Sequence, residues 1–170
     1  MVNTMHQLKT ISAAAVPRAI QKAERYRLLN QSWATESICL DILEIDPANQ
    51  AVIVMLLLAL TDQFSGETFE LTRRAQALLA RITDPYQRAY YEGIIHERLA
   101  HAKLAHTALQ AEAMAFESLR SAMDAFERAE ALRTPGNDDA ILRWNTCARA
   151  LERLRVVEQT EGHYEPTFGE

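Results

Sequence analysis

Glycine and proline are scarce in this chain, which has five of each in 170 residues. Both interrupt helices, because glycine leaves the backbone too flexible and proline lacks the amide hydrogen that a helical turn needs. Their scarcity, together with abundant alanine, favours an all-α protein. Since 48% of the residues are hydrophobic, the chain can bury a sizeable core, and we expect a single domain over residues 1–159.

Positive charge is not in excess either. The net charge is −5 and neither half of the chain is basic, so we expect no nucleic-acid partner, because a phosphate backbone requires a basic surface. The longest apolar run, residues 51–60, has ten residues, about half of what a membrane span needs. The N-terminus lacks a charged region followed by an apolar run, so we expect neither a signal peptide nor a membrane partner.

Cysteine is limited to Cys39 and Cys147, which lie far apart in the sequence. Each belongs to a helical apolar pattern, where a thiol behaves as a small hydrophobic side chain. We therefore expect two reduced core residues in a cytoplasmic protein, with a disulfide between them as the alternative.

What the chain does contain is a helix break that occurs three times, at Pro47, Pro85 and Pro135. Each time a long helical pattern of polar and apolar residues stops, and a new one starts within about four residues. Recurring breaks of this kind are typical of stacked helical hairpins, a class of protein that usually holds another protein.

Apolar residues spaced by three and four positions predict seven helices. They cover residues 17–29, 33–45, 50–63, 67–81, 85–104, 107–132 and 138–158. A capping box at Thr107–Gln110 marks the start of the long sixth helix and separates it from the fifth. The segment 160–170 contains two glycines and a proline, and we expect it to be a disordered tail.

The third predicted helix is apolar on all sides between Ala51 and Leu60. Such a helix must be covered by neighbours, so we expect it at the centre of the stack, with Asn49 as its N-cap. A buried strand is the alternative, because Val52, Ile53 and Val54 are β-branched. We prefer the helix, since no second strand is available to pair with it.

Residues 119–132 resemble the second helix of a tetratricopeptide repeat, which has large, small and aromatic residues at fixed steps before a closing proline. The matching residues are Leu119, Ala122, Phe126, Ala129 and Pro135, the proline one residue late. Two poorer copies close at Pro47 and Pro85. Counted from Pro17, the intervals between successive prolines are 30, 38 and 50 residues, against about 34 in the family. An irregular helical bundle is the alternative.

The resemblance implies a right-handed superhelix of antiparallel helices, in which the first helix of each hairpin lines a concave groove for an extended peptide. It places Val54 and Leu58 on this groove, unless the sixth helix covers the same surface. The implied function is a non-catalytic adaptor or scaffold that binds a protein or peptide. The rival is a structural homodimer that pairs through an apolar helix face.

Polar residues of the seventh helix are a second candidate for contacts with a ligand. Arg143 and Asn145 flank Trp144, and Asn145 lies one turn before Arg149, so the last two could hold a carboxylate together. The alternative is an exposed polar helix face. We expect Trp144 and Trp33 to be core aromatics.

Histidines recur at every fifth position, at His96, His101 and His106. Five residues turn a helix through about 500°, which leaves successive side chains about 140° apart and unsuited to sharing a metal ion. We interpret Glu92 with His96, and Glu97 with His101, as pairs on a solvated face. We expect no metal, no cofactor and no enzyme activity. A metal or small-ligand protein that uses the His96 and His101 region is the alternative.

Overall fold

The computed structural model describes residues 7–65, 68–105 and 111–161, with side chains as far as Leu154. These residues form seven α-helices and one turn of 3₁₀ helix, and they contain no strand. The elements are η1 (Ala13–Ala15), α1 (Val16–Leu28), α2 (Ser32–Ile45), α3 (Gln50–Thr61), α4 (Phe69–Leu79), α5 (Pro85–Leu104), α6 (Ala111–Leu132) and α7 (Asp139–Glu161). The all-α class is confirmed, and the strand alternative for residues 50–63 is wrong.

The helix ends lie within three residues of the predicted ones, apart from the start of α6. The predicted capping box at Thr107–Gln110 falls in a segment outside the described residues. The helix α7 extends to Glu161 and so includes the first two residues of the predicted tail. Residues 162–170 lie outside the described part of the chain.

Local sequence signals set the starts of α3 and α5. The side-chain oxygen of Asn49 accepts a hydrogen bond of 3.1 Å from the amide of Val52, as an N-cap does. Asp84 accepts one of 2.7 Å from the amide of Gln87. Pro85 occupies the first position of α5, where its missing amide hydrogen has no consequence.

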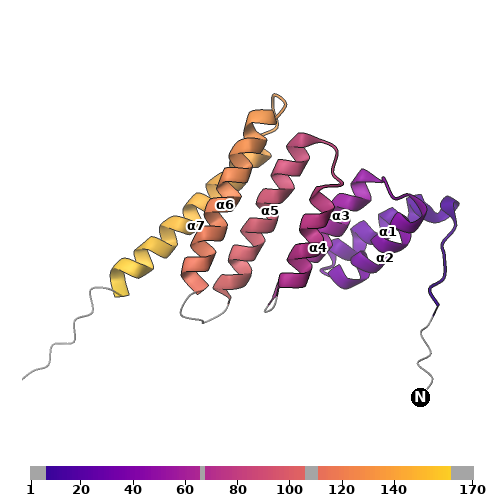
Figure 1. Ribbon diagram of the computed structural model, residues 1–170, viewed down its shortest axis with the longest axis horizontal. Coiled ribbons are helices and arrows are strands. Elements are labelled where there is room, and N and C mark those ends of the chain that lie inside the picture. Colours follow the sequence, from indigo (N-terminus) through magenta and orange to yellow (C-terminus); the bar gives the residue numbers. More distant parts are fainter. Residues whose placement is uncertain (1–6, 66–67, 106–110, 162–170) are drawn as a thin grey trace, which may run out of the picture.

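The helices follow one another along the long axis of the molecule, from α1 and α2 at one end to α7 at the other (Figure 1). Each helix packs most closely against its neighbours in sequence, and the most extensive pair is α5 with α6. Alternate helices also touch, α1 with α3 and α3 with α5. These three helices therefore share one side of the molecule.

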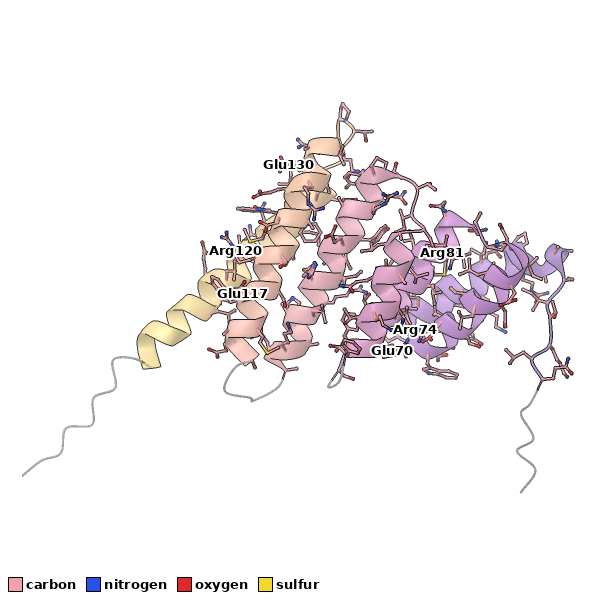
Figure 2. All side chains as sticks on the ribbon, viewed as in Figure 1. Glu70, Arg74, Arg81, Glu117, Arg120 and Glu130 are labelled. Atoms are coloured by element: carbon pink, nitrogen blue, oxygen red, sulfur yellow. The ribbon has the colours of Figure 1, made fainter. Side chains whose placement is uncertain are left out.

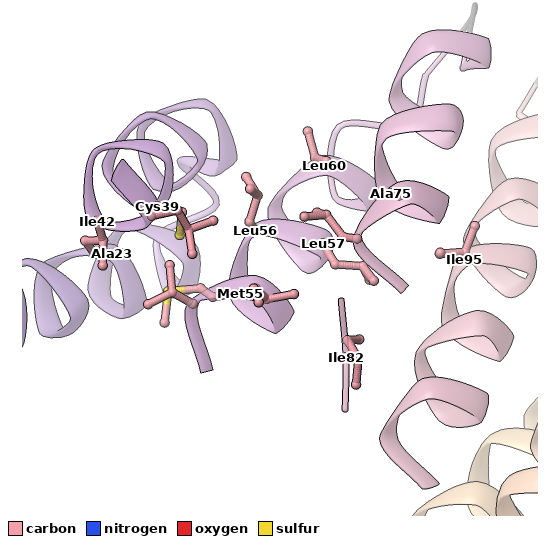
Figure 3. Close-up of a cluster of buried hydrophobic side chains, with 14 residues drawn as sticks. Ala23, Cys39, Ile42, Met55, Leu56, Leu57, Leu60, Ala75, Ile82 and Ile95 are labelled. Atoms are coloured by element: carbon pink, nitrogen blue, oxygen red, sulfur yellow. The ribbon is translucent and has the colours of Figure 1, made fainter. Parts of the chain in front are cut away.

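A first apolar core surrounds α3 and draws on α1, α2, α4 and α5 (Figure 3). The most deeply buried large side chains of α3 are Val52, Ile53, Leu57 and Leu60, each at most 1% exposed. The expectation that this apolar helix lies at the centre of a cluster is confirmed. Because neighbouring helices cover most of α3, the helix needs no polar face towards solvent.

A second apolar core joins α5, α6 and α7. Its centre is Phe126, which is fully buried and packs against the ring of Tyr90, with 5.7 Å between the ring centroids. A Cβ atom at Gly93 would lie 2.5 Å from the Phe126 ring, closer than any real contact. The absence of a side chain at Gly93 therefore lets α5 and α6 approach each other around this ring.

The opposite side of α6 faces solvent. Glu117 and Arg120 lie there with their side chains directed outward (Figure 2), whereas Ala115, Leu119 and Ala122 are buried. The helix α6 has 22 residues and packs on both α5 and α7. Its buried face of mostly small residues allows this packing, and its charged face remains in solvent.

Both cysteines are free and buried, as expected for core residues. Burial raises the pKa of Cys39 to about 12, with a further rise from Glu36. Burial raises the pKa of Cys147 to about 12 as well, mainly through loss of hydration. Among the described helices, none combines the length and apolarity that crossing a bilayer requires.

The two tryptophans differ. Trp144 is half-buried against the second core and donates a hydrogen bond of 2.9 Å to Glu127, as a core aromatic with a polar tip does. Trp33 is 71% exposed, so its assignment to the core is wrong. It stands in the first turn of α2, in the helix pair α1 and α2 at the end of the row of described helices.

Candidate functional site

A groove of about 570 Å³ lies on the side of the molecule that α1, α3 and α5 share. Its lining residues are Glu24, Arg27 and Leu28 from α1, Gln50, Ala51, Val54, Met55 and Leu58 from α3, and Gln87 and Tyr91 from α5. The two residues that the resemblance placed in a groove, Val54 and Leu58, both belong to this lining. No residue of α6 does.

The groove is apolar because α3 is apolar on every side and its neighbours do not cover all of it. Val54 and Leu58 remain half-buried between the two cores. On the wall formed by α1, Leu28 is 82% exposed. A side chain from another molecule that covered these three residues would remove apolar surface from water, which is favourable.

An ion-pair cluster fixes the end of the groove at the end of α3. The carboxylate of Asp62, just after α3, accepts from Arg27 of α1 at 3.1 Å and from Arg98 of α5 at 2.8 Å. Arg98 also donates to the carbonyl of Leu58 at 3.0 Å and to the hydroxyl of Thr61. Burial lowers the pKa of Arg98 and the charge of Asp62 opposes that shift. One carboxylate therefore ties all three groove helices together.

The start of α3 is fixed as well. The side-chain oxygen of Gln50 accepts from the amide of Thr83 at 2.9 Å and from its hydroxyl at 3.1 Å. Its amide group donates to the carbonyl of Arg81 at 3.2 Å. Gln50 thereby joins the first turn of α3 to the connection between α4 and α5. With both ends of α3 held, the floor of the groove is organised before any ligand arrives.

Sequence reasoning missed Arg27, Asp62 and Gln50. The partners Arg27 and Asp62 are 35 residues apart, and no periodic pattern connects them. Gln50 could have been found, because it lies one helical turn before Val54, on the same face as Val54 and Leu58.

The second group of predicted ligand residues is not part of the groove. Arg143 of α7 is engaged with Glu97 of α5, at 3.3 Å and 3.4 Å from its two carboxylate oxygens. Asn145 is half-buried and Arg149 is exposed, and neither lines the groove. Arg143 balances the charge of a carboxylate that is only 3% exposed, and contact of the three residues with a ligand stays a prediction.

The buried position of Glu97 also corrects the interpretation of the histidine pairs. Glu97 lies inside the protein and not on a solvated face, whereas His101 is exposed. His96 is half-buried, and its burial lowers its pKa. In the part of the chain that the structure describes, no three His, Cys, Asp or Glu side chains gather closely enough to hold a metal ion. His106 lies outside that part.

Family models, curated proteins and solved structures were each compared with the chain, and none matches it. The likeness to tetratricopeptide repeats therefore stays a prediction from the sequence. The groove between α1, α3 and α5 is the feature from which function can be argued.

Proposed function

We propose that the chain is a non-catalytic adaptor or scaffold that binds an extended peptide segment of another protein in the groove between α1, α3 and α5. The observation that carries the proposal is the apolar floor that α3 leaves uncovered in a hollow of about 570 Å³. That volume is in the usual range of ligand sites, about 300–1,000 Å³. The 12 residues of α3 span about 18 Å, enough for about five residues of extended peptide.

The residues that line the groove indicate which kinds of side chain the peptide carries. Leu28, Val54 and Leu58 provide apolar contact, and Gln87 and Glu24 provide hydrogen-bonding groups at the sides. We therefore expect a peptide with two or three apolar side chains that are spaced to face the floor. Because both ends of α3 are held before binding, little conformational entropy is lost there when the peptide enters.

The proposal includes the tetratricopeptide-like arrangement and a cytoplasmic location. The helices α1, α3 and α5 are the first members of successive hairpins, and these are the helices that line the groove. This agrees with the family's use of first helices as the inner wall. A right-handed superhelix is the arrangement that we propose for the complete set.

A selection from a random peptide library would test the proposal. Bound sequences are expected to share apolar positions, and Leu28→Glu should weaken their binding about tenfold or more, because it places a charge in the apolar wall. Leu28 is 82% exposed, so this variant keeps its fold. Leu142→Glu is the matched control, since Leu142 is 63% exposed on α7 and away from the groove. Equal binding by the wild type and both variants would reject the groove.

A further inference from the structure

The end of the molecule formed by α1 and α2 carries a second hollow, of about 450 Å³. Its lining includes four large apolar side chains, Ile11, Tyr26, Trp33 and Ile38. Trp33 is 71% exposed. A large aromatic side chain left open beside a hollow, at the end of a row of stacked helices, is surface that a partner can cover.

A strip of positive charge runs beside this hollow. Arg18, Lys22 and Arg25 lie on successive turns of α1 and are all exposed. In the described part of the chain, no carboxylate forms an ion pair with any of the three. They line a cleft of about 380 Å³ together with Gln21 and Tyr26.

The strip and the hollow form one surface. Lys22 and Tyr26 line both, and the ammonium group of Lys22 lies 5.6 Å from the centre of the Tyr26 ring. Asp41 is the acidic residue of the hollow lining, and Arg18 and Arg25 do not line the hollow. The surface therefore suits a ligand that carries acidic groups for the strip and an aromatic group for the hollow.

The chain itself contains such a segment. Residues 162–170 include Glu165 and Glu170 and no lysine or arginine. Tyr164 and Phe168 stand near these glutamates, each next to or two residues from one of them. We propose that residues 162–170 of a second copy of this chain bind on the α1–α2 surface, with their glutamates on the strip and an aromatic ring in the hollow beside Trp33.

The geometry favours a second copy over the chain's own segment. The end of α7 lies at the opposite end of the long axis from α1 and α2, and α7 runs away from them (Figure 1). The contact is therefore head to tail. Because it joins two different surfaces, it can repeat from copy to copy and form short open chains instead of a closed pair.

The test uses the full chain and a labelled peptide of residues 156–170, followed by fluorescence anisotropy. We expect saturable binding that weakens about fivefold or more between about 50 mM and about 500 mM NaCl, because exposed charges are screened by salt. Sedimentation velocity of the full chain should show association that increases with concentration in the micromolar range. The unlabelled peptide should reverse it.

Matched variants locate the site. Arg18→Glu with Arg25→Glu should weaken peptide binding about tenfold or more, because two attractive charges become repulsive. Arg120→Glu with Arg153→Glu makes the same change of net charge at exposed helical positions elsewhere and should leave binding within about twofold. Trp33→Ala should weaken binding without changing its dependence on salt.

Four outcomes would overturn the proposal. The proposal is rejected if the peptide does not bind. It is also rejected if the control charge variant loses as much peptide binding as the variant of Arg18 and Arg25. A full chain that stays monomeric while the peptide binds would show that the segment is held by its own copy. Ala51→Trp, which fills the other groove, should leave peptide binding unchanged; a loss would place the segment between α1, α3 and α5 instead.

Discussion

At the scale of single residues, the contact between Gly93 and Phe126 decides how closely α5 and α6 approach. Two effects oppose each other when Gly93 becomes alanine. Alanine is favoured over glycine inside a helix by about 1 kcal/mol. A methyl group 2.5 Å from the Phe126 ring overfills the core, which costs about 1–3 kcal/mol.

We expect overfilling to win, because Phe126 is fully buried and has no space to move into. Gly93→Ala should lower the free energy of unfolding by about 1–2 kcal/mol in urea titrations. Adding Phe126→Leu to Gly93→Ala should cost less than the two single changes together, since the smaller side chain relieves the clash. A Gly93→Ala protein more stable than the wild type would show that the helices separate without cost.

The half-buried His96 makes stability depend on pH. Its burial lowers its pKa below the ordinary 6.5, Glu92 opposes this shift, and Lys103 and Arg128 add to it. The unfolded chain therefore binds a proton at His96 more readily than the folded protein does. The contribution to stability is complete above about pH 6.5 and decreases as the pH falls through that value towards the lower folded pKa.

Removing the imidazole should flatten this dependence. The difference in unfolding free energy between about pH 7 and about pH 5.5 should be smaller in His96→Gln than in the wild type. His101→Gln is the control, since His101 is exposed, and it should keep the wild-type slope. Identical slopes in all three proteins would exclude His96 as a source of the dependence.

At the scale of elements, a single carboxylate links α1 to α5 by ion pairs. Asp62 accepts from Arg27 and Arg98, and its side chain is 24% exposed. Asp62→Asn should lower the free energy of unfolding by about 1–2 kcal/mol, between the values of exposed and buried ion pairs. Hydrogen exchange should become faster in α1, which has few other contacts with α3 and α5.

The pair of Glu70 with Arg73 provides the control for Asp62→Asn. It lies within α4, and both side chains are more than 60% exposed. Glu70→Gln should change stability much less than Asp62→Asn does, and it should leave exchange in α1 unaltered. Equal effects of the two substitutions would mean that Asp62 acts as an ordinary surface charge.

The elements themselves could be predicted, because each carries its own signal. The apolar run of α3 and the cap at Asn49 are local, and so is the proline that opens α5. Contacts between helices carry no such signal. The sequence pattern shows that Trp33 lies in a helix, but it does not show that the described neighbours leave its side chain 71% exposed. For the same reason the sequence did not show that Arg143 pairs with Glu97, which lies 46 residues away.

At the scale of the whole molecule, the described residues form two cores that meet at α5. Ile95 belongs to the core around α3, and Ile94 belongs to the core with α6 and α7. In stacked helical proteins each unit contacts only its neighbours, so stability is a sum of local contributions and can be lost from one end. The described helices show the same restriction to near neighbours, since α1 has no extensive contact beyond α3.

Cavities placed in each core would test whether the two ends unfold separately. Leu57 and Leu119 are both fully buried, one in each core, and replacement of either by alanine should cost about 2–5 kcal/mol. In Leu57→Ala, hydrogen exchange should quicken mainly in α1 to α4, and in Leu119→Ala mainly in α6 and α7. Because α5 contributes to both cores, its amides should respond to both substitutions. If either substitution instead quickened exchange equally in all seven helices, the protein would unfold as one cooperative unit. Its stability would then not be a sum of local contributions, even though its helices follow one another in a row.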